Sequence, residues 1–365
     1  MNRAPLDPQT LSTSAQRAVA PGPSKMMAAR GLMPLSPSDQ LAVLYQLSLD
    51  DNAAVAQAAK NTAASLPEKL LVGTLVDPRV DPRILDYFGL LGLGKHAVTD
   101  AVILNPGVDD ETLAAIAGRG TAHDVDLIAQ NEQRILRFPE IIAAMYLNRH
   151  ARMSTIDRIV ELAVRNNVRV PGLAAWDEIA RALQSAGKST ATDDVLLAKL
   201  TVDKDDELFT RGTGEEVLEE GDHGPEAAEE AKKAFDEASM PAKIRLATLG
   251  NASARAVAIR SPIRMIAAAA VKAPGVTQIE IVRWAGNPNL VEDVARYIAG
   301  QREYTKMYGV KVSLCRNPKA PISEVMRFMP FLREKDLKNL ARSRGVPAAI
   351  VAQARKLTMQ RSGKK

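Results

Sequence analysis

A short pattern of apolar residues around an Asn-Pro or Asp-Pro step recurs along this chain, and it limits the possible folds more than any other feature. The step occurs at Asp77, Asn105, Asn287 and Asn317. We call these four residues the anchors. Small or apolar residues stand three, eight, eleven and twelve places after each anchor: Val80, Leu85, Phe88 and Gly89; Val108, Leu113, Ile116 and Ala117; Leu290, Ala295, Ile298 and Ala299; Ala320, Val325, Phe328 and Met329.

The offsets predict a helix that begins just after each anchor. Offsets of eight, eleven and twelve residues fall on one face of a helix. Proline fits the bend before it, because proline cannot continue a preceding helix but is tolerated where the next one opens. The anchors are 28 residues apart in the first pair and 30 in the second. Such a spacing indicates stacked helical repeats, and we expect an all-α fold built as an α-solenoid.

The bulk composition agrees with short, closely packed helices. The chain has 365 residues, of which 46% are hydrophobic and only 4% aromatic. The single cysteine, Cys315, excludes an internal disulfide, and no run of about 18 apolar residues suggests a membrane span. The N-terminus lacks the continuous apolar core of a secretory signal. We therefore expect a cytoplasmic protein.

The charge is distributed very unevenly. Residues 203–237 carry 14 acidic and 4 basic side chains, whereas residues 238–365 carry 7 acidic and 24 basic ones. Together with the repeat pattern, this predicts five segments: a disordered N-terminal tail (1–37), an N-terminal repeat array (38–202), an acidic linker (203–242), a basic C-terminal repeat array (243–359) and a basic tail (360–365). Within the linker, a short helix is expected from Pro225 to Ala238.

The offsets and the short, proline-broken helices resemble the HEAT-like and leucine-rich-variant families of α-helical repeats, over about two thirds of the chain. This resemblance implies a curved surface that holds a protein or nucleic-acid partner. Some leucine-rich-variant proteins carry an iron–sulfur cluster on several cysteines. With one cysteine here, no such cluster is expected.

No catalytic, cofactor or metal site emerges from the motifs. His96, His123 and His150 recur every 27 residues, and on neighbouring helix pairs we expect them about 10 Å apart, too far to share a metal ion. Gly89 to Lys95 has the spacing of a phosphate-binding loop but is followed by His96 instead of a hydroxyl residue. We predict that the protein is not an enzyme and that it has no cofactor.

Basic and tyrosine side chains alternate in one part of the C-terminal half, and this surface is the predicted partner-binding site. Lys and Arg clusters attract phosphate backbones, and tyrosines stack on exposed bases. The same pattern also suits a solvated face whose long side chains cover apolar surface. The residues are Arg296, Arg302, Lys306, Lys311, Arg316, Lys319, Tyr297, Tyr304 and Tyr308.

Three functions are compatible with these features. The favoured one is a non-enzymatic adaptor or scaffold that binds another protein through its repeat surface. The alternative is a nucleic-acid-binding module that uses the basic C-terminal array. The third is an enzyme with a pocket between the two arrays. The sequence leaves the oligomeric state open, and the acidic segment is either a spacer or a mask for the basic array.

Overall fold

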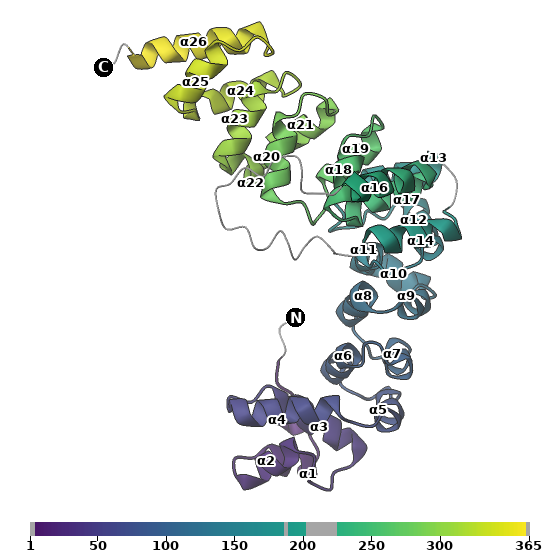
Figure 1. Ribbon diagram of the computed structural model, residues 1–365. Helices are drawn as coiled ribbons and strands as arrows, with labels where there is room; N and C mark the ends of the chain where they lie inside the picture. The colour runs from purple at the N-terminus through teal and green to yellow at the C-terminus, as the bar shows by residue number, and fades with distance from the viewer. Residues whose placement is uncertain (1–3, 186–188, 202–224, 363–365) are drawn as a thin grey trace. The chain divides into compact units, whose positions relative to one another are not determined.

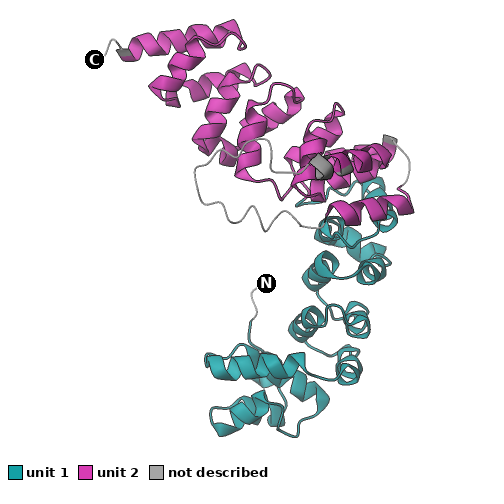
Figure 2. Cartoon of the chain, viewed as in Figure 1, with its two compact units in different colours: residues 1–172 teal, residues 173–365 magenta. Residues whose placement is uncertain are grey.

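The computed structural model describes residues 4–185, 189–201 and 225–362, and within these ranges the chain forms helices and no strands (Figure 1). The chain divides into two compact units, residues 1–172 and 173–365 (Figure 2). None of the described helices is both long enough and apolar enough to cross a membrane.

Unit 1 is a succession of short helices, many of which pack against the helix two or three places further along the chain. α5 contacts α7 and α7 contacts α9, while α6 contacts α8 and α8 contacts α11. The elements are η1 (Pro8–Thr10), α1 (Thr13–Val19), α2 (Pro23–Ala29), α3 (Pro37–Ser48), α4 (Ala53–Ala64), α5 (Glu68–Leu75), α6 (Pro82–Leu91), α7 (His96–Ile103), α8 (Asp110–Arg119), α9 (Ala122–Ile128), α10 (Glu132–Arg137), α11 (Glu140–Leu147) and α12 (Met153–Arg165).

Unit 2 continues in the same manner, with α17 against α19, α19 against α21 and α20 against α23. Its elements are α13 (Trp176–Ser185), α14 (Ala191–Leu200), α16 (Pro225–Glu237), α17 (Met240–Leu249), α18 (Ala252–Ile259), α19 (Arg264–Val271), α20 (Gln278–Gly286), α21 (Glu292–Gly300), α22 (Arg302–Lys306), α23 (Tyr308–Arg316), α24 (Ile322–Phe328), η2 (Met329–Phe331), α25 (Glu334–Ala341) and α26 (Ala348–Ser362).

The anchors mark the bends between helices, as predicted. Helices α6, α8, α21 and α24 each begin a few residues after an anchor. The apolar residues at the predicted offsets are buried, including Ile298 and Val325 with no exposed surface. Val80 is the exception, because it is only half-buried.

The side chain of each anchor explains why asparagine or aspartate stands there. Its Oδ1 atom accepts a hydrogen bond from the backbone N–H two residues later, at 2.9 Å for Asp77, 2.8 Å for Asn105 and 2.9 Å for both Asn287 and Asn317. This bond replaces a backbone turn and fixes the bend. Asn148 forms the same turn with His150, at 2.9 Å, although no proline follows it.

Three of these asparagines also bond to the end of a helix that lies 30 to 32 residues earlier in the chain. The side-chain amide of Asn105 donates to the carbonyls of Leu75 and Asp77, at 2.7 and 3.0 Å. That of Asn317 donates to Ala285 and Asn287, at 2.9 and 3.3 Å. Since Leu75 and Ala285 each stand two places before an anchor, the two junctions have the same geometry. The amide of buried Asn148 likewise donates to Ala117 and Gly120.

The predicted disordered tail is wrong for the part of residues 1–37 that the structure describes. Helices α1 and α2 lie in this range, and Ala15, Ala18 and Ala29 on them are fully buried. Pro23 and Pro37 stand at the starts of α2 and α3, where a missing N–H costs little. Short alanine-rich helices show too few turns for a helical period to be visible in the sequence.

The helices that flank the predicted acidic linker belong to one unit. α13 and α14 precede it, and both pack against α17, which follows it. Ser239 N–H donates to the Asp193 carboxylate at 3.0 Å, and Lys272 pairs with the buried Glu178 at 2.9 Å. Residues 203–224 of the predicted linker lie outside the described ranges, and the helix expected from Pro225 is α16.

Candidate partner-binding groove

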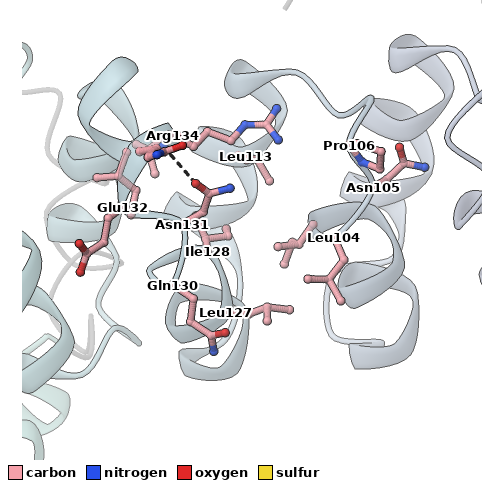
Figure 3. Close-up of a pocket in the computed structure, with 14 residues that line it drawn as sticks. Leu104, Asn105, Pro106, Leu113, Leu127, Ile128, Gln130, Asn131, Glu132 and Arg134 are labelled. Carbon is pink, nitrogen blue, oxygen red and sulfur yellow. Dashed lines mark hydrogen bonds between the residues drawn. The ribbon is translucent and has the colours of Figure 1, made fainter.

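A groove of about 610 Å³ opens in unit 1 where the C-terminal ends of α7 and α9 lie side by side (Figure 3). Its base is formed by core side chains of α8, α10 and α11, among them Leu113, Ile135 and Ile141. The rim comes from the turns that follow α7 and α9. The groove therefore lies at the ends of two helices.

Two leucines give the groove an apolar lining that is open to solvent. Leu104 ends α7 and is 67% exposed, which is unusual for a leucine in this chain. Leu127 on α9 is half-buried, and in Figure 3 the two side chains extend toward one another. An apolar side chain of a ligand that lies between them would bury both, which favours binding.

A run of polar side chains lines the same groove. Gln130, Asn131, Glu132 and Gln133 are all exposed. Asn131 is exposed and uses its Oδ1 atom to cap α10 by accepting from the Arg134 N–H at 3.1 Å. Primary amides carry both donors and acceptors, and they match the N–H and C=O groups of an extended peptide.

The remaining polar side chains of the groove are engaged in holding its walls. The Asn105 amide donates to the Leu75 carbonyl, as described above. The Arg134 guanidinium donates to the carbonyl of Val108 and to the Asp110 carboxylate, which Arg137 also contacts at 2.8 Å. Burial raises the pKa of Asp110, but hydrogen bonds from these two arginines outweigh it and leave that pKa below its usual value.

The predicted basic surface is largely occupied by contacts within unit 2. Arg296 pairs with Glu292, and Arg316 pairs with Asp336 at 3.3 Å. Lys319 donates to the carbonyl of Leu290 at 2.7 Å, and the Lys311 ammonium lies 5.4 Å from the centre of the Phe331 ring. Arg302 and Lys306 on α22 are exposed and form no ion pair with the described residues.

The three tyrosine side chains of that surface are each partly covered by neighbouring residues. The Tyr308 hydroxyl donates to Asp336 at 2.6 Å, and the Arg333 guanidinium covers its ring at 4.6 Å. Tyr297 is half-buried beneath the Lys272 ammonium, 5.7 Å from the ring centre. Tyr304 is half-buried as well. Burial raises the pKa of both Tyr297 and Tyr304, so they remain neutral phenols.

Two of the three histidines, His96 and His123, are closer together than their spacing in the sequence predicted. The rings of His96 and His123 are in edge contact, with their centres 5.0 Å apart, and the His123 Nε2 atom lies 2.9 Å from the Asp100 carboxylate. The prediction of about 10 Å was wrong because it used the distance between helix axes, whereas side chains reach across that distance. Within the described residues, no group of three or more histidine, cysteine, aspartate or glutamate side chains is arranged to hold a metal ion.

The groove was not predicted from the sequence. One signal was available, because Leu104 stands directly before the anchor Asn105 and the polar run Gln130 to Gln133 follows α9. Nothing local shows that the two turns lie side by side. Comparison of the chain with protein-family models, with curated proteins and with solved structures found no match.

Proposed function

We propose that this protein is a non-enzymatic scaffold, an α-solenoid of HEAT-like repeats that binds an extended segment of a partner protein in the unit 1 groove. The observation that carries the proposal is the pairing of Leu104 and Leu127 with exposed amide side chains in one hollow of about 610 Å³. The successive packing of alternate helices and the equivalent junctions at Asn105 and Asn317 support the repeat assignment.

The lining defines the ligand by its chemistry. Two leucines accept one apolar side chain, and the carboxamides of Gln130, Asn131 and Gln133 pair with main-chain groups on either side of it. Glu132 lies 3.6 Å from Arg158 and adds no unopposed charge. The groove therefore suits an uncharged extended peptide with a central leucine, isoleucine or methionine better than it suits an anionic ligand.

Selection from a displayed library of random peptides tests this proposal and does not require an identified partner. Peptides selected on the wild-type protein are expected to share a central apolar residue and to lose at least ten-fold in affinity for a Leu104→Glu variant. Leu32→Glu is the matched control, because Leu32 is 65% exposed in the same unit but lies outside the groove. Equal binding to the wild type and to Leu104→Glu would contradict the proposal.

Nucleic-acid binding through unit 2 is the second candidate, and it is favoured by the exposed Arg302 and Lys306, which form no ion pair with the described residues. A double Arg302→Glu, Lys306→Glu variant should then bind oligothymidine more weakly, with a shallower dependence on salt concentration. Lys335→Glu, an exposed substitution on α25, serves as the control. If the two variants bind alike, α22 is not a nucleic-acid contact.

A further inference from the structure

A second groove of about 610 Å³ lies in unit 2, between α16 and the α18–α19 turn. Phe235 of α16, Val257 of α18, and Pro262, Ile263 and Ile266 at the start of α19 make it mainly apolar. Ile263 is 38% exposed, so part of this apolar surface faces solvent. This groove shares no residue with the one in unit 1, and its function is independent of the proposal above.

Basic side chains stand beside the apolar surface. Lys232 and Arg260 are exposed, and Lys243 is half-buried with its ammonium 3.4 Å from the carbonyl of Asp236. Two carboxylates, Glu229 and Asp236, also line the groove. The combination suits a short ligand that places apolar side chains on the floor and carboxylates next to the three cations.

The chain itself contains such a ligand immediately before α16. Residues 215–220 read Glu-Glu-Val-Leu-Glu-Glu, an apolar pair with two carboxylates on each side. We propose that the unit 2 groove binds acidic segments with a central apolar pair, and that residues 215–220 of this chain are the occupant. The wider stretch 203–222 carries nine acidic and two basic side chains, so its charge is opposite to that of the three cations in the groove.

The lengths of the two segments permit this contact. From Leu218 to Pro225 the chain spans up to about 24 Å when extended. The rise along α16 from Pro225 to Lys232 is only about 10 Å. A short tether also gives the segment an effective concentration in the millimolar range, which suffices for a weak complex.

The test uses the full chain and a fluorescein-labelled synthetic peptide of residues 213–222. In wild type the chain's own segment occupies the groove and excludes the peptide. A Val217→Ser, Leu218→Ser variant releases the groove, and the peptide should bind it at least ten-fold more tightly, as measured by fluorescence anisotropy. A Leu208→Ser, Phe209→Ser variant is the matched control, since it alters the other apolar pair of the acidic stretch, and it should behave like wild type.

A further substitution tests whether the peptide binds in this groove. Lys232→Glu, added to the released variant, should weaken peptide binding at least ten-fold, and high salt should do the same. Binding that is equal in wild type and the released variant, absent in both, or insensitive to Lys232→Glu would overturn the proposal. If the wild type is a dimer and the Val217→Ser, Leu218→Ser variant is a monomer, the segment is exchanged between two copies. This result would overturn the proposal that the segment occupies the groove of its own chain.

Discussion

Replacing Asn317 by alanine tests whether the anchor asparagines stabilise the packing between one bend and the bend before it. The side chain is 1% exposed and forms three hydrogen bonds: its amide donates to the carbonyls of Ala285 and Asn287, and its Oδ1 atom accepts from the Lys319 N–H. Alanine removes all three and leaves at least one buried carbonyl without its partner. At roughly 1 kcal/mol for each of the three bonds, we expect a loss of about 2–4 kcal/mol in the free energy of unfolding.

Thermal and urea unfolding followed by circular dichroism measure this loss. For a unit of this size, 1 kcal/mol corresponds to a melting-temperature shift of about 2–4 °C, so a decrease of about 5–15 °C is expected. Asn289→Ala is the matched control, because Asn289 is an exposed asparagine near the preceding anchor that contributes only its backbone N–H. It should cost less than about 0.5 kcal/mol. Equal stability of the two variants would refute the structural role of the buried amide.

Three other measurements test the fold. Ile298→Asp or Val325→Asp should each cost several kcal/mol of stability, because both side chains are fully buried, and a melting temperature equal to that of the parent would mean that the helix faces are misassigned. Burial raises the pKa of the Cys315 thiol from 9.0 to about 12, so this thiol should not react with a thiol reagent at pH 8 until the protein unfolds. The stability that the neutral thiol contributes should be complete below pH 9 and should be lost between pH 9 and 12. A Cys315→Ala variant should not show this loss. Limited proteolysis should cut first between residues 201 and 239, and the fragments should elute together from a sizing column, since α13 and α14 pack against α17; separate elution would contradict that packing.

The helical fold and the buried face of several helices followed from the sequence alone. Periodicity is a local property, and a helix that buries one side must repeat its apolar residues every three or four positions. That is why the residues eight and eleven places after each anchor, such as Ile298 and Val325, could be assigned to the core from their spacing alone. The four anchors were also visible, because each combines a proline with a side chain that can accept a backbone hydrogen bond.

The N-terminal helices α1 and α2 were not predicted, because they show no local periodicity. α1 and α2 have seven residues each, too few to show a period, and their stability comes from tertiary contacts. The Tyr45 hydroxyl donates to the carbonyl of Ala4 at 2.7 Å, and the Thr62 hydroxyl donates to that of Ala29 at 2.7 Å. Partners this far apart in the sequence leave no local signal.

Tertiary structure determined which side chains are available at each of the two candidate sites. The basic surface was chosen from sequence proximity, yet Arg316 and Tyr308 both contact Asp336, which lies at least twenty residues further along the chain. The unit 1 groove instead combines Leu104 at the end of α7 with Leu127 on α9. Composition and periodicity determine that a helix forms and which face it buries, whereas the side chains left free to bind a partner depend on which turns the packing brings together.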